Sequence, residues 1–172
     1  MAEGMSLSFS RAGEGDAAAL VALRDQAARW QAARGIVQWR PGDMGLGHFL
    51  KRMELGEVWL ARADRGALAG AWELWWDDPL TWGAQPPSAG YIHRLMVDRS
   101  AAPPGSGRVL LAAAERRIAE SGRTLARLDC AASNARLRRY YTDAGYTEAG
   151  EQPLPRGSRY PVTLFEKRLR EG

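Results

Sequence analysis

The chain has 172 residues, a length that fits one domain able to bury a sizeable core. Residues Met1–Arg11 contain no apolar leader, and no apolar run approaches the about 20 residues of a membrane span, so we expect a cytoplasmic protein without a membrane partner. The net charge of +4 comes from arginines interleaved with acidic residues rather than clustered on one face, which disfavours nucleic acid as a partner.

The first half of the chain predicts two helices and a hairpin. Apolar residues after Asp16 recur at helical spacing until Gly35, and Gly56 ends a second, shorter helical segment. His48 lies just before that segment, and we expect it at the surface. Two strands flank the tight turn 63–66, which is typical of a hairpin. In chain order, these elements are a strand at Leu7–Arg11, a helix from Asp16 to Gly35, a loop at Gly35–Gly42, a short helix at Phe49–Leu55, and strands at Val58–Arg62 and Ala67–Trp75.

The second half alternates strands and helices after a connection rich in proline and glycine. In chain order, the elements are a strand at Tyr91–Val97, a helix that starts near Gly105, a strand at Leu125–Ala131, a helix from Asn134 to Gly145, and strands at Tyr146–Glu151 and Val162–Lys167, which a Pro/Gly loop separates. Neither an internal repeat nor an interdomain linker interrupts the pattern. The order of elements therefore predicts one domain over residues 1–172, built on a mixed α/β sheet.

The loop after Val97 contains the run Gly105-Ser106-Gly107-Arg108. A helix start presents unpaired N–H groups and the positive end of the helix dipole, so the four N–H groups of this run can bind an anion such as a pyrophosphate. Many α/β folds use the same Gly-x-Gly pattern only as a packing turn. The loop alone leaves both interpretations open.

A second motif lies downstream of this loop, in the segment from Asn134 to Tyr146. Asn134-x-x-Leu137-x-x-Tyr140-Tyr141 is followed by Gly145-Tyr146. Together with Val97 and the Gly-x-Gly loop, this order resembles the GNAT N-acetyltransferase superfamily over the central and C-terminal two-thirds of the chain. The resemblance implies an α/β (α+β) fold with a mixed, mostly antiparallel central sheet of about six to seven strands, a central parallel pair splayed for CoA, and about four flanking helices.

The resemblance also implies how acetyl-CoA, the acyl donor, is held. The pantetheine arm would pair with the backbone of Leu95, Met96 and Val97, the pyrophosphate would lie over Gly105, Ser106, Gly107 and Arg108, and Asn134 and Tyr141 would contact the donor. Asn134 serves equally well as a simple N-cap. The chain departs from the family at Ala102, where Arg or Gln is usual, and at Pro103-Pro104, which have no N–H to offer a phosphate. Arg99 or Arg108 could supply the missing charge.

The chemical step requires a proton acceptor, because an amine that attacks a thioester must first lose a proton. Histidine is the side chain whose ordinary pKa suits that task, and His93 is one of only two histidines. The run Tyr91-x-His93-x-Leu95-x-Val97 is similar to the His-x-His-x-Leu-x-Val strand of arylalkylamine N-acetyltransferases, in which histidines serve the proton relay. By strand alternation these four residues share one face. A histidine that is hydrogen-bonded within the core is the alternative interpretation of His93.

Two further roles follow from the resemblance. Tyr141 occupies the family's position for the general acid that protonates the departing thiolate, and the backbone N–H of Leu95 would receive the carbonyl oxygen as oxyanion donor. Alternatively, Tyr140 and Tyr141 only pack the helix against the sheet. Adjacent helical residues point about 100° apart, so one tyrosine can pack while the other faces the donor.

The acceptor site is expected among tryptophans and carboxylates that precede the donor site. The chain has seven tryptophans, and the acceptor candidates are Trp39, Trp72, Glu73, Trp75, Trp82 and Tyr91. An aromatic wall with a carboxylate suits an amine that carries an apolar or aromatic body. Core packing is the alternative for each tryptophan, and Asp77 and Asp78 are equally explained as turn residues before Pro79.

The expected function is acetyl transfer from acetyl-CoA to the primary amine of a small molecule by direct attack. Two alternatives stay open: a protein N-terminus or lysine as acceptor, and a non-catalytic acyl-CoA-binding module, which the Ala102-Pro103-Pro104 loop motivates. The single cysteine, Cys130, lies in a predicted strand as a core residue or, alternatively, as a nucleophile, and no Cys or His spacing indicates a metal. We expect a monomer or a homodimer.

Overall fold

The computed structural model of the protein describes residues 6–36, 39–153 and 160–170. Parts of three predicted segments lie outside the described residues: residues 1–5 of the N-terminal start, 37–38 of the loop at Gly35–Gly42, and 154–159 of the loop between the last two strands. None of the described helices combines the length and the apolar character that a membrane crossing requires.

The described ranges contain seven strands and five α-helices. Their bounds are β1 (Ser8–Arg11), α1 (Ala17–Ala33), α2 (Leu46–Leu55), β2 (Glu57–Arg62), β3 (Leu68–Trp75), α3 (Pro79–Trp82), β4 (Ala89–Val97), α4 (Ser106–Glu120), β5 (Leu125–Ala131), α5 (Ala135–Asp143), β6 (Thr147–Gln152) and β7 (Val162–Arg168). Short 3-10 turns at Glu14–Asp16 and Asp64–Gly66 precede α1 and connect β2 to β3. The predicted order of strands and helices is confirmed, and α3 is an addition that the pattern does not predict. Its four residues are too few for helical periodicity to be visible.

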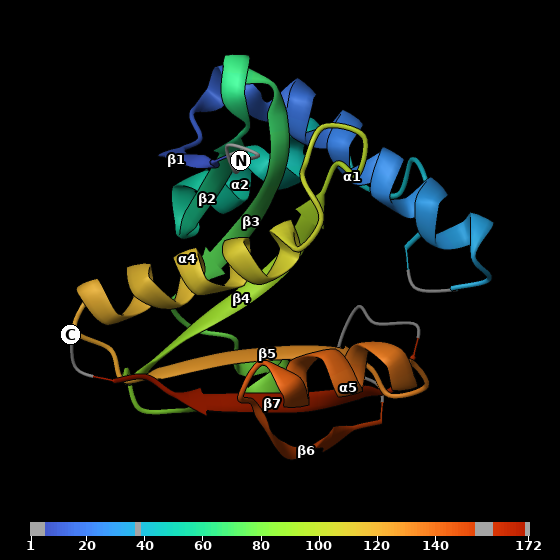
Figure 1. The fold of residues 1–172 in the computed structure, drawn as a ribbon. Coiled ribbons are helices and arrows are strands. Elements are labelled where there is room, and N and C mark those ends of the chain that lie inside the picture. Colours follow the sequence, from blue (N-terminus) through green and yellow to red (C-terminus); the bar gives the residue numbers. More distant parts are fainter. Residues whose placement is uncertain (1–5, 37–38, 154–159, 171–172) are drawn as a thin grey trace, which may run out of the picture. The chain divides into compact units, whose positions relative to one another are not determined.

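The strands hydrogen-bond in the order β1-β2-β3-β4-β5-β7-β6 (Figure 1). β4 and β5 pair in parallel, whereas β1–β2, β2–β3, β5–β7 and β6–β7 are antiparallel. This arrangement confirms the mixed, mostly antiparallel sheet with a parallel pair. The parallel pairing joins Ala89–Tyr91 to Leu125–Arg127, at the start of both strands.

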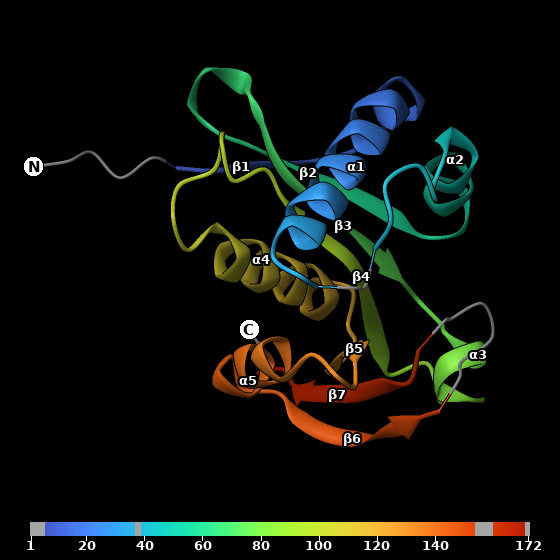
Figure 2. The same ribbon diagram turned by 90° about the vertical axis from the view of Figure 1, so that its right-hand side faces the viewer.

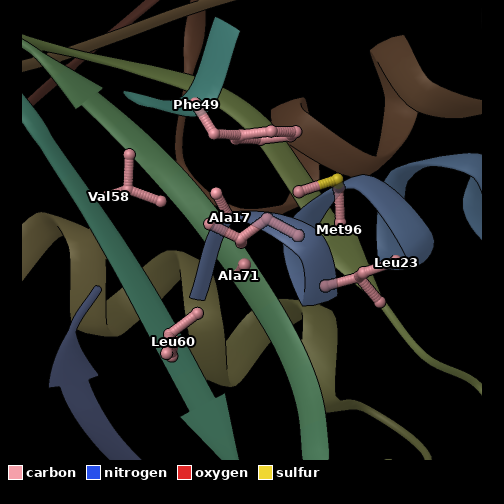
Figure 3. Close-up of a cluster of buried hydrophobic side chains, with 8 residues drawn as sticks. Ala17, Leu23, Phe49, Val58, Leu60, Ala71 and Met96 are labelled. Atoms are coloured by element: carbon pink, nitrogen blue, oxygen red, sulfur yellow. The ribbon is translucent and has the colours of Figure 1, made fainter. Parts of the chain in front are cut away.

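Two compact units share β4 and α4 along the chain. The first consists of the residues up to Leu74 with Arg94–Ala113, and the second of Trp75–His93 with the residues from Ala114 on. In the first unit, α1 and α2 cover one face of β2 and β3 (Figure 2). Side chains from these helices and from β2, β3 and β4 form a core of Ala17, Leu20, Leu23, Phe49, Val58, Leu60, Ala71 and Met96 (Figure 3). Each large apolar side chain buried here contributes about 1.5 to 3 kcal/mol to stability.

In the second unit, α5 packs on the β5–β7–β6 part of the sheet. The ring of Tyr141 on α5 lies 5.6 Å from that of Phe165 on β7, centroid to centroid, and 6.0 Å from that of Tyr146. Tyr146 donates a hydrogen bond to Glu115 of α4 at 2.8 Å, and Lys167 of β7 pairs with the same carboxylate at 2.9 Å. These contacts fix α5 and its C-terminal end within the unit.

Two glycines allow α4 to approach the sheet closely. A β-carbon at Gly70 would lie 2.6 Å from both Leu110 Cδ2 and the Met96 carbonyl oxygen. In the second unit, one at Gly90 would lie 2.5 Å from Ile118 Cγ1. Because successive strand residues point to opposite faces, the contact at Gly70 places the start of α4 on the face opposite to Ala71 and the α1–α2 core. Neither contact leaves room for a side chain on the strand.

The expected alternation along the whole of β4 is wrong. Arg94 has a φ of 46°, a left-handed conformation within the strand, so the period of two is interrupted there. His93 is the last β4 residue of the second unit, and Leu95 follows Arg94 in the first. The residue type gives no warning of this break, since arginine has no preference for positive φ.

Candidate functional site

His93 forms a hydrogen-bonded pair with Asp78 in the second unit. His93 Nε2 lies 2.9 Å from Asp78 Oδ2, and the side chains are 15% and 3% exposed. Asp78 precedes Pro79 as the N-cap residue of α3, but its side chain does not cap the helix and instead reaches His93. A nearly buried carboxylate requires a partner, and the imidazole supplies it. The pair resembles the carboxylate–imidazole arrangement that fixes a catalytic histidine's tautomer.

Trp75 stacks on the ring of His93. The ring centroids are 3.8 Å apart, with an angle of 25° between the planes. The imidazole is therefore held by a hydrogen bond at one nitrogen and by an aromatic face. The expected acceptor residue Trp75 thus lies directly beside the expected catalytic residue His93.

Asp129 of β5 adds a second carboxylate to this pair. One ligand atom from each of Asp78, His93 and Asp129 lies within 4.8 Å of the others. This spacing lets the three side chains hold a cation, whether a substrate ammonium or a metal ion. The absence of a metal, expected from the sequence, stays a prediction.

Tyr91 belongs to a second cluster in the same unit. Arg127 Nη1 donates to the Tyr91 hydroxyl at 2.9 Å, and Arg127 Nε donates to Glu166 at 2.7 Å. The Arg127 guanidinium also lies 4.7 Å from the ring centroid of Trp82, whose ring meets Tyr91 edge-on at 5.9 Å. Tyr91 is 3% exposed and Trp82 half-buried. Arg127 therefore ties α3 to the paired ends of β4 and β5.

Tyr141 is held on α5 with its hydroxyl available. Burial, with a smaller contribution from Cys130, holds the pKa of the Tyr141 phenol well above its usual range. Its hydroxyl makes no hydrogen bond to another of the residues that the structure describes. The side chain is partly accessible. The phenol therefore stays protonated at neutral pH, and its hydroxyl hydrogen, which no described residue accepts, is available to a leaving group.

The glycine loop begins α4, as expected, but offers fewer free N–H groups. Gly105 has a φ of 83°, and the helix starts at Ser106. The expectation of four outward N–H groups is wrong, because the N–H of Ser106 donates to Pro103 at 3.3 Å and that of Arg108 to Gly105 at 3.2 Å. Among the described residues, the N–H groups of Gly105 and Gly107 have no such acceptor. These two are the groups that a phosphate can engage.

Two other residues that are expected to contact the acyl donor have structural roles as well. Asn134 is the N-cap of α5, and its Oδ1 accepts the N–H of Leu137 at 3.0 Å, as the N-cap alternative requires. Its amide nitrogen has no partner in the described part of the chain. The Met96 side chain belongs to the core of the first unit, so only its backbone is available to a ligand, whereas Leu95 and Val97 are half-buried.

The other residues that are expected to line the site of the acetyl-accepting amine lie in the first unit. Trp72 is 1% exposed and stacks on Trp59 at 6.0 Å, which favours the core-packing alternative. Glu73 is fully buried, bonded to His48 and Arg94, and has no surface to offer an acceptor. Trp39 is half-buried, packs against the core and lies under the Arg24 guanidinium at 5.0 Å. The expectation of a surface position for His48 is also wrong, since its side chain is 24% exposed and bonded to Glu73.

The sequence profile of the acetyltransferase (GNAT) family matches residues 23–146. The chain belongs to the GNAT acetyltransferase family. This GNAT acetyltransferase is similar over nearly its whole length to a solved GNAT-family acetyltransferase from Listeria monocytogenes, with 28% identity, a TM-score of 0.81 and 98% of each chain covered. The expected family, fold and class of enzyme are thereby confirmed. No curated protein matches the sequence.

Two more distant structures share the fold of this GNAT acetyltransferase. AAC(6')-Ib, solved in complex with ribostamycin and coenzyme A, is 19% identical with a TM-score of 0.71, covering 95% of this chain and 93% of its own. The ribosomal-protein-S18-alanine N-acetyltransferase of Escherichia coli is 15% identical with a TM-score of 0.71, covering 97% and 96%. One of these structures holds ribostamycin and the other protein is named for an alanine of a ribosomal protein, so the shared fold does not select an acceptor.

The sequence indicates only one of the two carboxylates beside His93. Asp78 is expected either near the acceptor or as a turn residue before Pro79, whereas Asp129 is only a polar interruption of a buried strand. A usable signal for Asp129 was its position: a carboxylate in β5, the strand that pairs with β4. No comparable signal exists for Arg127, whose burial depends on Tyr91 and Glu166, 36 and 39 residues away.

Proposed function

We propose that this GNAT acetyltransferase transfers the acetyl group of acetyl-CoA to the primary amine of a small molecule by direct attack. The observation that carries the proposal is the His93–Asp78 pair with Trp75 stacked on the imidazole. A buried carboxylate, an oriented imidazole and an aromatic face are the groups needed to bind an amine and remove its proton.

The proton path begins at His93. In the tautomer whose Nε2–H donates a hydrogen bond to Asp78, Nδ1 keeps its lone pair and can accept the amine proton. The side chains of Asp78 and Asp129, which lie beside His93, attract the incoming ammonium. Trp75 then contacts the body of the amine, and Trp82 adds a second aromatic surface near Tyr91.

The acyl donor is handled by residues carried over from the family. The N–H of Leu95 receives the developing oxyanion, and Tyr141 protonates the departing thiolate. The N–H groups of Gly105 and Gly107, which have no acceptor among the described residues, bind the pyrophosphate, and the Asn134 amide contacts the acyl donor. The pantetheine arm pairs with the backbone of Leu95–Val97 as an added strand would.

Thiol release tests this proposal. The protein is incubated with acetyl-CoA alone, with a panel of small aliphatic and aromatic amines, and with peptides that carry a free N-terminus or a lysine, and free CoA thiol is followed. We expect release with a class of small amines and none without amine. Release with peptides alone would assign a protein acceptor instead. No release with any acceptor, together with measurable acetyl-CoA binding, would assign a binding module.

A further inference from the structure

Glu73 carries a charge into the core of the first unit. The residue is on β3 and 0% exposed, and each of its carboxylate oxygens has a partner. Oε1 accepts from Arg94 Nη1 at 3.3 Å, and Oε2 lies 2.7 Å from His48 Nε2. A carboxylate at this depth is costly unless it is paired, so both contacts are required of the folded state.

Arg94 has a conformation that its residue type disfavours. Its φ of 46° lies in the left-handed region, inside β4 rather than in a turn. The other non-glycine residue with positive φ in the described chain is Arg65, which lies in the turn between β2 and β3. A left-handed backbone is disfavoured for any residue with a β-carbon, so other contacts must hold Arg94 there.

We propose that Glu73 is a positioning residue for acetyl transfer, because it holds Arg94 in the left-handed conformation that directs the N–H of Leu95. The peptide that follows Arg94 carries this N–H, and its direction depends on the Arg94 backbone. An extended Arg94 would project its side chain to the other face of the strand. The guanidinium would then leave Glu73, and a buried carboxylate would lose a cation.

His48, on α2, makes the second contact with the Glu73 carboxylate. By binding Oε2, it fixes the second oxygen of the carboxylate, so that Oε1 is directed at Arg94. The ring of His48 also meets Phe49 edge-on at 5.1 Å, and Phe49 is a fully buried core residue. The core of the first unit is thereby connected through two side chains to the backbone of β4. The role assigned to Leu95 rests on the proposed function.

A pair of substitutions at Arg94 isolates the backbone conformation. Arg94→Ala and Arg94→Gly remove the same ion pair, but only glycine adopts a positive φ without strain. We expect Arg94→Gly to have a higher melting temperature than Arg94→Ala and a kcat about tenfold higher, with similar KM for acetyl-CoA. A purely structural role would move stability and leave the kcat of the two variants equal.

Substitution of the carboxylate tests the same link from the other side. Glu73→Gln keeps the shape of the side chain but removes its charge, and we expect kcat to fall about tenfold with acetyl-CoA affinity unchanged. Adding Arg94→Gly to Glu73→Gln should restore part of the lost kcat, because glycine adopts a positive φ without a side-chain contact that keeps it there. Glu57→Gln, a change at another buried carboxylate on the neighbouring strand β2, is the matched control and should leave kcat as in the wild type.

The outcomes separate this inference from the proposed function. Equal melting temperatures of Arg94→Gly and Arg94→Ala would show that Arg94 is not held left-handed and would overturn the inference. The inference would also be overturned if Arg94→Gly were more stable than Arg94→Ala but the two variants had equal kcat values. A folded Glu73→Gln variant with wild-type kcat would overturn it as well. A wild-type protein that transfers acetyl to no amine would overturn the proposed function and the positioning role with it, while the order of melting temperatures would still report on the Arg94 backbone.

Discussion

At the scale of single residues, the proposed proton path depends on how one imidazole is held. Asp78 fixes one ring nitrogen of His93 at 2.9 Å, and Trp75 covers one ring face at 3.8 Å. A histidine with its tautomer and plane fixed loses little entropy when it meets the amine. The alternative, a histidine that is hydrogen-bonded within the core, accounts for the contact with Asp78 but does not require the second carboxylate, Asp129, nearby.

Substitution of His93 or Asp78 should alter the pH dependence of the reaction. We expect His93→Ala to lower kcat/KM most at the pH values where the imidazole of the wild type is unprotonated and can accept the amine proton, and so to flatten the ascending limb of the profile. Asp78→Asn keeps the imidazole but removes the carboxylate that orients it, and should lower kcat by about 10- to 100-fold. Near-wild-type turnover of either folded variant from about pH 6 to about pH 9 would mean that the residue is structural.

Tyr141 is the second residue whose chemistry can be separated from its packing. Because burial raises its pKa, the phenol stays protonated as pH rises past the ordinary tyrosine value of about 10, so the acid form is lost only in more alkaline solution. We expect Tyr141→Phe to lower kcat by about 10²- to 10⁴-fold with little change in acetyl-CoA affinity.

The adjacent tyrosine provides the control for that substitution. Tyr140→Phe removes the same hydroxyl from the same helix and should leave kcat close to the wild-type value, because its ring meets Tyr141 edge-on at 5.6 Å but is not assigned to the leaving group. Equal kcat losses in the two variants would show that the tyrosines act by packing α5.

At the scale of elements, the start of α4 should determine the affinity for CoA. Gly105 has a φ of 83°, and a β-carbon there would meet nothing within 4 Å, so a side chain would occupy only space outside the protein. We expect Gly105→Val to weaken CoA binding by about tenfold or more, because it strains the turn and fills the space above the two free N–H groups. Calorimetric titration with CoA gives this affinity.

Gly122 offers a matched substitution at the other end of α4. It has a φ of 90°, and a β-carbon there would also meet nothing within 4 Å. Gly122→Val should therefore cost a similar amount of stability while leaving CoA affinity unchanged. Equal affinities of the two folded variants would place the phosphates elsewhere on the molecule.

At the scale of the whole molecule, periodicity and turn residues predict the element order, and the motif spacing predicts the family. The helix that starts at the glycine loop follows from the local pattern, and the parallel pair β4–β5 follows from the family resemblance. The partners of Glu73 do not, because His48 and Arg94 are 25 and 21 residues away and only the folded sheet brings them together.

The remaining gaps have a similar cause. The Asp78–His93 contact spans 15 residues and depends on α3, which is too short to be seen as a periodic pattern. The left-handed Arg94 is held by tertiary contacts rather than by its residue type. The cytoplasmic location and the monomeric or homodimeric state stay predictions.

The central claim is that the acetyl group passes directly from acetyl-CoA to the amine within one complex. The cysteine that could otherwise carry it, Cys130, is buried, and burial, with a smaller contribution from Asp129, raises its pKa to about 12, so its thiolate is scarce at neutral pH. Initial rates over a matrix of acetyl-CoA and amine concentrations test this claim most directly. We predict reciprocal plots that intersect, and no thiol release before amine is added. Parallel plots with a burst of thiol from acetyl-CoA alone would demonstrate an acetyl-enzyme and contradict direct attack.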